Sequence, residues 1–477
     1  VPKGSVIAFS YIGFLTQELP AADSGVMNVV MSEDTGLLDE VVVVGYGTQS
    51  RYTLTTAIGQ YSGEKMEGSP VNSIGENLKG KVSGLRVATT SMEPGANPRF
   101  LIRGGSSINQ SNDPIIMVDG VQRDMTGLNP NDIESIEILK DAASAGIYGS
   151  RASNGVILIT TKKGTSSKKS QIVFNAQLGY QQPERKYDLM NAADYLRIVR
   201  PALEESLFPS VLYGAESAGT GNNEGSKWTP RYLEDGEAVP NGWQSIIDPV
   251  NPTKTIIFQD NDQQSQWFGD ALWQSYYVGV NGDTNKMTYA ASAGYTSDSG
   301  MGVATGFDRF TFHGNTSFEV VKNLTASTTF DYGETKMEDF PSNTRNTVIR
   351  GLSIPNTHRD YLEDGTPALG TNNTTITAAF YDRYYVRNNI QKRSSFNMNL
   401  NWKIVDGLNA VVQISNHNRH TRSNSFIKAN AISTLRETRE GFSELNRVNF
   451  QTYLNYKKSF ADKHRIDLLG GYDFNSK

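Results

Sequence analysis

Residues 394–404 read SSFNMNLNWKI, and from Phe396 onward apolar and polar side chains alternate strictly. An extended chain with this period has one oily face and one hydrated face. The same alternation recurs at 322–332 and 448–457. We therefore expect antiparallel strands that separate an apolar environment from a wet one. The apolar members of the first stretch are Phe396, Met398, Leu400, Trp402 and Ile404.

The second half of the chain contains about nine such stretches, joined by turns and loops of very unequal length. Tight turns such as 281–285 and 406–407 contrast with about 90 residues after the first strand and roughly 60 after Gly333. Short turns on one rim and long loops on the other are typical of outer-membrane β-barrels, and strands of about ten residues can cross the hydrocarbon layer. A large soluble antiparallel protein would share the period, but the loop lengths favour the barrel. The expected strands are 172–181, 274–281, 286–297, 307–319, 322–333, 392–404, 408–422, 446–459 and 463–474, with Tyr180, Tyr295, Phe318, Tyr456 and Tyr472 near the membrane interfaces.

Composition narrows the function classes. The 477 residues include 22 Tyr and 20 Phe, contain no cysteine and carry a formal charge of -5. Disulfides and thiolate metal sites are therefore excluded, and the slight acidity argues against nucleic acid as a partner. No run approaches 18 apolar residues, which argues against a helical membrane span. The chain begins at Val1 without a signal peptide, and we expect a processed or truncated start.

Residues 51–165 form a different unit, in which the alternation gives way to short mixed elements. A helix is expected at 74–81, and a second one after Asp141, whose carboxylate could cap the amides of Ala143 and Ser144. A small α/β domain that leads directly into a barrel strand would fit the lumen as a plug. Its expected strands are 84–88, 99–103, 115–118, 135–139 and 156–161.

An acidic and β-branched run precedes this unit. It comprises Asp39, Glu40 and four valines, Val41, Val42, Val43 and Val44, and Gly45 and Gly47 follow. The valines favour an extended backbone, so the run could pair with a partner by strand addition. The alternative is an ordinary buried strand.

Three ordered blocks resemble the SusC/RagA family of TonB-dependent outer-membrane transporters. They are the run from Asp39 to Gln49, the block from Asp113 to Val121 with the preceding Arg103-Gly104-Gly105-Ser106-Ser107, and the long block from Leu128 to Ile157. The resemblance continues through 190–196 into the first strands and covers nearly the whole chain. It implies a mainly β fold: a transmembrane antiparallel barrel of 22 strands with a small α/β plug domain in its lumen.

The resemblance also implies a domain order. Residues 1–35 would be the end of a carboxypeptidase-regulatory-like β-sandwich, 36–50 the TonB-box segment and linker, 51–165 the plug domain, and 166–477 the N-terminal part of the barrel. Only about nine of the 22 strands fit after residue 170. Nine strands cannot close around a plug of this size, because barrel diameter grows with strand number.

The function implied by the resemblance is TonB-dependent active import of oligosaccharides. No arrangement of nucleophile, base and oxyanion donors is visible in the sequence, so we expect neither enzyme activity nor a cofactor. A SusD-like substrate-binding lipoprotein would close the outer mouth as a lid. The TonB complex of the inner membrane would pair with residues 39–44, and outer-membrane lipid of a Gram-negative bacterium, of the Bacteroidota, would surround the barrel. Import of oligopeptides and a passive receptor or adhesin role are the alternatives.

Ligand contacts are expected in one upper plug loop, which offers hydroxyl and amide groups suited to sugar hydroxyls or peptide backbone. Aromatic residues of the long loops could stack on sugars or could simply pack. His417 and His420 lie three apart on one strand, hence on opposite faces, and Asp260 with Asp262 lacks the rest of a calcium loop. No metal site is therefore expected. The loop residues are Ser106, Ser107, Asn109, Gln110 and Asn112; the aromatic residues are Trp228, Trp243, Tyr381, Tyr384 and Tyr385.

Overall fold

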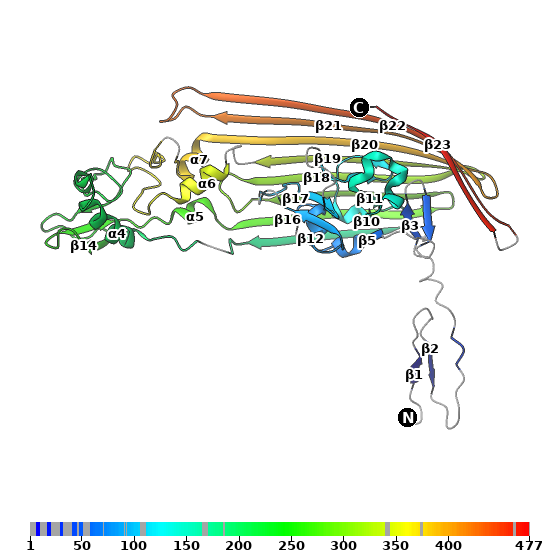
Figure 1. Ribbon diagram of the computed structural model, residues 1–477, viewed down its shortest axis with the longest axis horizontal. Coiled ribbons are helices and arrows are strands. Elements are labelled where there is room, and N and C mark those ends of the chain that lie inside the picture. Colours follow the sequence, from blue (N-terminus) through cyan, green and yellow to red (C-terminus); the bar gives the residue numbers. More distant parts are fainter. Residues whose placement is uncertain are drawn as a thin grey trace.

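A computed structural model gives the architecture. It describes residues 6–9, 17–20, 29–31, 41–44, 47–50, 58–69, 71–89, 91, 93–104, 111–164, 170–184, 187–338, 344–372, 375–460 and 464–476. The main feature is a nine-stranded antiparallel sheet, called the barrel sheet below, in which each strand pairs with the next one along the chain (Figure 1). Its strands are β12 (Gln171–Gln181), β16 (Ala271–Thr284), β17 (Met287–Asp298), β18 (Gly306–Val321), β19 (Leu324–Glu338), β20 (Tyr385–Val405), β21 (Leu408–Ile427), β22 (Glu437–Phe460) and β23 (His464–Ser476).

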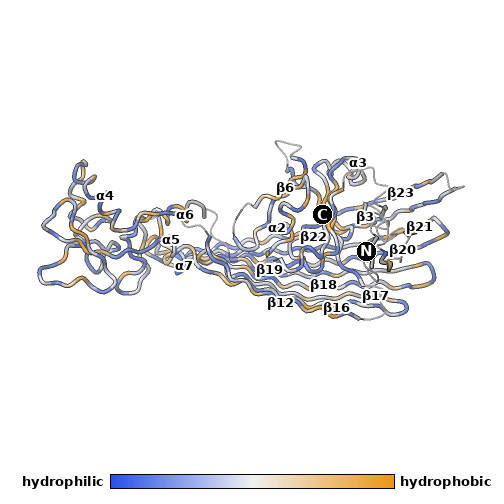
Figure 2. Tube along the Cα trace, turned by 90° about the horizontal axis from the view of Figure 1, so that it is seen from below, coloured by the Kyte–Doolittle hydropathy of each residue, from blue (hydrophilic) through white to orange (hydrophobic). Residues whose placement is uncertain are grey.

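The alternating pattern sets the two faces of this sheet. On β18, β19 and β20, even positions such as Phe312, Phe330 and Phe396 are exposed on the outer face, whereas odd positions such as Thr329 and Asn397 are buried on the inner face. The hydropathy-coloured trace follows the same alternation along the strands (Figure 2). The predicted fold class, a mainly β protein with part of a barrel and a plug, is confirmed.

The strands β20 to β22 are longer than the pattern predicts. β22 has 24 residues and begins at Glu437, nine residues before the expected start at Asn446. Its first residues, Glu437-Thr438-Arg439-Glu440, are polar on both faces, so they give no alternating signal, yet they continue the ladder with β21. Backbone pairing thus continues past the point where the apolar pattern ends.

The plug domain, residues 58–164 here, lies against the inner face of the barrel sheet (Figures 1 and 2). Its five-stranded sheet has the order β5-β10-β11-β8-β9, with β8 and β11 parallel. A buried core that includes Ile133, Ile136 and Ile157 holds this sheet together. The elements are β5 (Ile58–Ser62), η2 (Gly63–Met66), α2 (Ile74–Asn77), β6 (Leu85–Ala88), β7 (Arg99–Ile102), β8 (Ile115–Val118), β9 (Val121–Gln122), η3 (Pro130–Asp132), β10 (Ile133–Leu139), α3 (Ala142–Ala145), η4 (Gly146–Tyr148), η5 (Ser150–Asn154) and β11 (Val156–Thr161).

Two local predictions in the plug domain are wrong. The helix expected over 74–81 ends at Asn77, and Gly80 beyond it has a φ of 71°, which an α-helix cannot contain. The Asp141 side chain makes no cap hydrogen bond at the start of α3. Its carboxylate instead forms an ion pair with Arg103, so a tertiary partner replaces the local one.

Two hairpins precede the plug domain. β1 (Val6–Phe9) pairs with β2 (Gln17–Pro20), and β3 (Val41–Val44) pairs with β4 (Gly47–Ser50). The sheet of β3 and β4 has two strands, so the second edge of β3 pairs with no described strand. β3 lies near the short-turn end of the barrel sheet (Figure 1). The predicted domain boundaries remain predictions.

The long loops fold into units of their own at the opposite end (Figure 1). One packs α4 against a three-stranded sheet through buried residues that include Leu196, Ile256 and Phe258. Another surrounds Trp267 and Phe380. No helix in the described part of the chain has the length and apolar character needed to cross a membrane. The elements are α4 (Ala192–Glu204), η6 (Pro209–Tyr213), β13 (Arg231–Tyr232), β14 (Gln244–Ile247), β15 (Thr255–Phe258), α5 (Gln263–Trp267), α6 (Thr344–Leu352) and α7 (Ala378–Tyr384).

Candidate functional site

Asp331 of β19 is the centre of the polar contact between the plug domain and the barrel sheet. Its two carboxylate oxygens pair with Arg123 Nη2 of the plug domain and with His313 Nδ1 of β18, each at 2.7 Å. His313 Nε2 faces the carbonyl oxygen of Lys162 at 3.3 Å. Both ring nitrogens of His313 thus face acceptors, which suits the protonated imidazolium. Asp331 therefore balances two cations in a buried position.

A second carboxylate, Asp132, enters the barrel sheet from the plug domain. It accepts hydrogen bonds from the Tyr277 hydroxyl at 3.0 Å and the Ser292 hydroxyl at 2.5 Å. Burial raises the pKa of Asp132, and these hydrogen bonds oppose the rise. Together with Asp331, this group joins the plug domain to β16, β17, β18 and β19 through polar rather than apolar contacts.

The turn between β8 and β9 also touches the sheet wall. Asp119 and Gly120 both have positive φ, 50° and 80°, which is the backbone of a type I′ turn. The Asp119 carboxylate accepts hydrogen bonds from the amide and hydroxyl of Thr161 at 3.0 and 2.8 Å, and this contact holds the residue in its unusual conformation. The Asp119 carbonyl accepts hydrogen bonds from Asn397 and Gln413. The φ of Gly120 favours glycine, and a Cβ there would lie 3.2 Å from the Gln413 amide, which would have to shift slightly.

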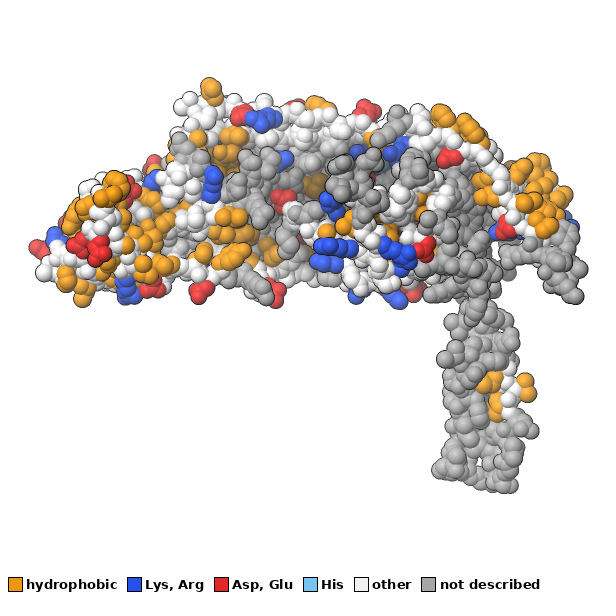
Figure 3. Space-filling model, viewed as in Figure 1, with side chains coloured by type: hydrophobic (Ala, Val, Ile, Leu, Met, Phe, Trp, Pro, Cys, Tyr) orange, Lys and Arg blue, Asp and Glu red, His pale blue; other side chains and the backbone are white. Residues whose placement is uncertain are grey.

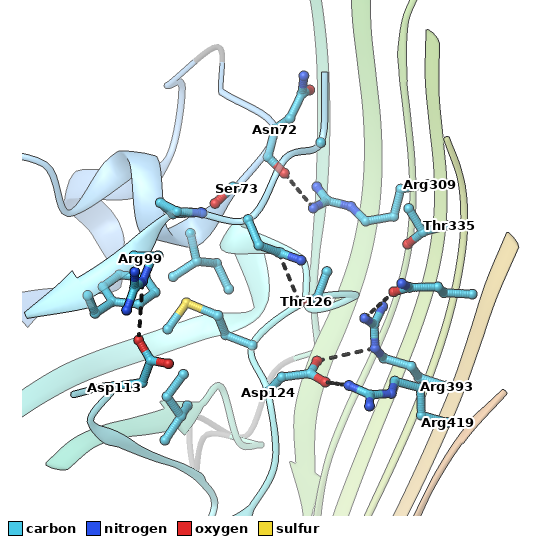
Figure 4. A pocket seen from close by; sticks show the side chains of 18 of the residues that line it. Asn72, Ser73, Arg99, Asp113, Asp124, Thr126, Arg309, Thr335, Arg393 and Arg419 are labelled. Carbon is cyan, nitrogen blue, oxygen red and sulfur yellow. Dashed lines mark hydrogen bonds and ion pairs between the residues drawn. The ribbon is translucent and has the colours of Figure 1, made fainter. Parts of the chain in front are cut away.

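Between the plug domain and β18 to β21 lies a cavity of about 380 Å³. It lies toward the long-loop ends of these strands, since β18 begins at Gly306 next to the lining residues Phe307 and Arg309. The plug contributes Phe100, Met125 and other apolar groups to its wall. Figure 4 shows Arg99 and Asp113 on one side and arginines of the sheet on the other.

Strand register brings the cationic groups of this cavity together. Arg393 of β20 is directly opposite Arg419 of β21, a like-charged cross-strand pair. Asp124 of the plug domain lies between them, with Oδ1 3.2 Å from Arg393 Nε and Oδ2 3.0 Å from Arg419 Nη1 (Figure 4). Arg309 donates from Nη1 to the Asn72 carbonyl at 2.7 Å. One plug carboxylate thus serves two arginines of the wall.

Comparison with known proteins explains this combination of plug and wall. Residues 50–156 match the family described as TonB-dependent Receptor Plug Domain. The TonB-dependent receptor SusC of Bacteroides thetaiotaomicron is 32% identical over 319 residues, which cover 65% of this chain and 27% of SusC. The chain is a SusC/RagA-like TonB-dependent receptor. The resemblance seen in the sequence motifs is confirmed.

Further relatives of this TonB-dependent receptor match over nearly its whole sequence. TonB-dependent receptor P39 of Formosa agariphila is 28% identical over 490 residues, 99% of this chain and 42% of P39. The structure of the RagAB peptide importer in the closed-closed state superposes with a TM-score of 0.73 at 24% identity, covering 89% of this chain and 48% of that chain. The chain thus spans less than half the length of these relatives.

Of the loop residues expected to contact ligand, Asn112 is described, and it lies beside the cavity of this receptor. Asn112 is half-buried and directly precedes Asp113, which lines the cavity. Ser106, Ser107, Asn109 and Gln110 lie outside the described residues, as do Asp39 and Glu40 of the predicted TonB-docking segment. Both sets of site residues remain predictions.

The aromatic residues of the long loops pack within the loop units. Trp228 is buried with its ring edge against His358, the centroids 4.6 Å apart. Tyr381 is buried and stacks on Tyr385. Phe380 packs on Tyr384, and Trp243 lies beneath the guanidinium groups of Arg231 and Arg359. These contacts support the packing alternative.

The remaining polar candidates have structural roles as well. Asp260 Oδ1 accepts from the Ala192 amide and from Asn356, and Asp262 caps α5. His417 is buried on the inner face of β21 and His420 is exposed, as their spacing predicts. The described residues contain no group of three or more side chains that could hold a metal ion.

Sequence reasoning missed the arginines of the cavity. The three arginines of the barrel sheet occupy inner-face positions, where the alternation could have marked them as facing the lumen, but a single arginine in a strand carries no signal of its own. Asp124, in the plug block, gave none either. The missed residues are Asp124, Arg309, Arg393 and Arg419.

Proposed function

We propose that this chain belongs to an outer-membrane transporter that imports oligosaccharides by TonB-dependent active transport together with a SusD-like lid lipoprotein. The observation that carries the proposal is the plug domain held against the inner face of the barrel sheet by buried polar contacts. Each charged group in these pairs has its partner in only one arrangement of plug and sheet. When the plug moves, water can take the place of the lost partner, whereas an exposed apolar surface gains no such partner. An interface of this type suits a plug that must open and reseat.

The segment from Asp39 to Val44 is the proposed docking site of the TonB complex of the inner membrane. β3 is extended, its outer edge pairs with no described strand, and it lies upstream of the plug domain near the short-turn end. Strand addition at such an edge needs main-chain hydrogen bonds and little from the side chains. Tension on this segment would reach the plug domain directly along the chain.

The surface of the long-loop units supports a protein partner at that end. Large apolar side chains around α4 are exposed, with Leu207 at 91% and Phe208 at 67% of their full exposure. Hydrophobic side chains gather at this end of the molecule (Figure 3). Exposed apolar groups of this size are typical of a surface covered by another protein, here the proposed lid lipoprotein.

Peptides are the alternative ligand class. The RagAB structure is described as that of a peptide importer, and its likeness to this chain concerns the fold. Hydroxyl and amide groups in the plug loop could bind sugar hydroxyls or peptide backbone alike. Oligosaccharides are proposed first because glycan import is the common role of the family that the sequence motifs resemble.

Deletion of residues 39–44 from the full-length protein in its host tests the proposal. Fluorescently labelled oligosaccharides and tetrapeptides would be scored separately for binding to the cell surface and for entry into the periplasm. We expect entry to fall to the level of cells lacking the protein while surface binding stays unchanged, because only energy coupling is removed. Entry at the undeleted level would contradict active import and favour a passive receptor or adhesin, and the labelled class that enters would distinguish sugar from peptide.

A further inference from the structure

We propose that the cavity between the plug domain and β18 to β21 binds a carboxylate group of the transported ligand. The inference rests on the proposed function and adds the chemical class of the ligand to it. Anionic ligands would then be preferred over neutral ligands of the same size. Its basis is the charge, the geometry and the accessibility of the cavity.

The cavity has an excess of positive charge. Four guanidinium groups line it, against the carboxylates of Asp113 and Asp124. Two positive charges therefore remain without a lining counter-charge, in a space partly screened from water, where an anion interacts more strongly than at an open surface. The four arginines are Arg99, Arg309, Arg393 and Arg419.

Arginines on the barrel-sheet side of the cavity also have N–H donors without hydrogen-bond partners among the described residues. Arg393 is buried at 7% exposure, and its Nη1 has no hydrogen-bond partner among the described residues; the same holds for Nε of buried Arg309. Arg393 and Arg419 are directly opposite each other, and like charges in such a position repel. Asp124 offsets part of this repulsion, and a second carboxylate would complete the balance.

Arginines of this cavity already lie beside carboxylates of the plug domain. Arg393 and Arg419 both contact Asp124, and Arg99 Nε lies 3.7 Å from Asp113 Oδ1. Guanidinium groups bind planar carboxylates through paired N–H donors. A ligand carboxylate would use the donor that is left over on this wall, Arg393 Nη1.

Size and access are suitable for a ligand residue. The volume of about 380 Å³ lies within the range of small-molecule sites, and Phe100, Phe307 and Met125 give it an apolar wall for a sugar ring or an aliphatic side chain. Arg99 and Asp113 are each more than half exposed, so a ligand can reach the cavity from that side. A uronic acid and an acidic amino acid both have this combination of a carboxylate and a small body.

The test uses the purified full-length transporter in detergent and isothermal titration with two pairs of probes. One pair is trigalacturonate and its methyl ester; the other is tetraglutamate and tetraglutamine with amidated C-termini. We expect at least one acidic probe to bind about tenfold more tightly than its neutral counterpart, with the preference declining at high salt. The acidic probe that binds identifies sugar or peptide as the source of the carboxylate.

Two variants assign the binding to the cavity. Arg419→Gln should weaken the acidic probe about tenfold, and Arg422→Gln, three residues further along the same strand and paired with Glu440 on the outer face, serves as its matched control. Because loss of Arg419 could also loosen the plug domain, Arg99→Gln is the second variant: the Arg99 side chain is exposed, and its ion pair among the described residues is with Asp113 of the same domain. It should weaken the same probe.

Equal affinity for acidic and neutral probes, absence of acidic binding, or equal losses in Arg419→Gln and Arg422→Gln would overturn the inference. These outcomes are independent of the proposed function. A transporter that imports neutral ligands only when residues 39–44 are present would keep its function and lose only the carboxylate preference. Failure of the deletion experiment would remove active import and leave the binding measurement interpretable.

Discussion

Among single residues, His358 in the long loops is held neutral by its surroundings. Its ring is fully buried, Nε2 donates to the Leu369 carbonyl oxygen at 2.9 Å, and Nδ1 has no hydrogen-bond partner among the described residues. Burial lowers the pKa of His358 to about 4, and the nearby charge of Lys227 adds to this. An unfolded chain would take up the proton near the ordinary pKa of 6.5.

Acidification should therefore weaken the long-loop unit through His358. The unfolded state binds a proton below pH 6.5 and the folded state only near pH 4, so stability is complete above about 6.5 and is lost as pH falls toward 4. From pH 7.5 to 5 the advantage of the native protein over His358→Gln should shrink by about 2 kcal/mol. Denaturant unfolding of the long-loop unit, monitored by tryptophan fluorescence, measures it.

The comparison with His358→Gln is necessary because a neighbouring group changes the stability with pH in the opposite direction. Burial raises the pKa of Asp360 to about 6, so this carboxyl adds stability as pH falls through that value. His420→Gln is the control, since His420 is exposed on β21. A pH response that is the same in the native protein and in His358→Gln would show that His358 is not responsible.

At the scale of elements, the hairpin of β3 and β4 shows how a strand can pair along one edge and still offer its other edge to an added strand. Val44 pairs with Gly47, with two residues between them, as expected for a hydrogen-bonded pair that closes a hairpin. The alternation of an antiparallel ladder then directs the amides of Val41 and Val43 away from β4. These amides are the ones that an added strand would use.

Proline at Val43 should remove one outward donor without breaking the hairpin. We expect Val43→Pro in the full-length protein to reduce ligand entry at least tenfold, because strand addition depends on main-chain hydrogen bonds. Val43→Thr keeps both the donor and the extended preference and should transport normally. Entry of labelled ligand measures both, and equal transport by the two variants would argue against docking through this edge.

The elements also show how far sequence patterns reach. Alternation predicted all nine strands of the barrel sheet because each has an apolar outer face. The alternation does not show the polar extension of β22, because pairing with β21 leaves no hydropathy signal. The sequence also predicts a helix longer than α2, because the positive φ of Gly80 is not visible in hydropathy. The sequence predicts a local cap by Asp141, but its carboxylate forms an ion pair with a distant residue, Arg103.

At the scale of the molecule, the plug domain and the barrel sheet depend on each other through buried charge. Arg123 and Asp331 are 208 residues apart in sequence, and both are buried where they meet. Removing one member of such a pair leaves the other charged and unpaired, which is far more costly than losing an exposed ion pair. His313 would share this loss because it faces the same carboxylate.

Asp331→Asn should therefore weaken plug docking by about 3–5 kcal/mol. The full-length protein would be heated in detergent, and release of the plug would be followed by its cleavage with a protease. Asp308→Asn is the matched control, because Asp308 lies on the outer face of β18 and accepts only one described hydrogen bond, from the Tyr295 hydroxyl. Equal release temperatures in the two variants would contradict the role given to Asp331.

The sequence by itself determined the strands of the barrel sheet, the kind of plug domain that precedes them and the family, because these depend on local hydrophobic period and on ordered motifs. Only the tertiary structure decided which polar residues meet. Asp124 and Arg419 are 295 residues apart, and register between strands together with docking of the plug domain brings them to 3.0 Å. Such contacts are long-range, so no window of sequence contains both partners, and the cationic cavity that they form becomes visible only when sheet and plug are assembled.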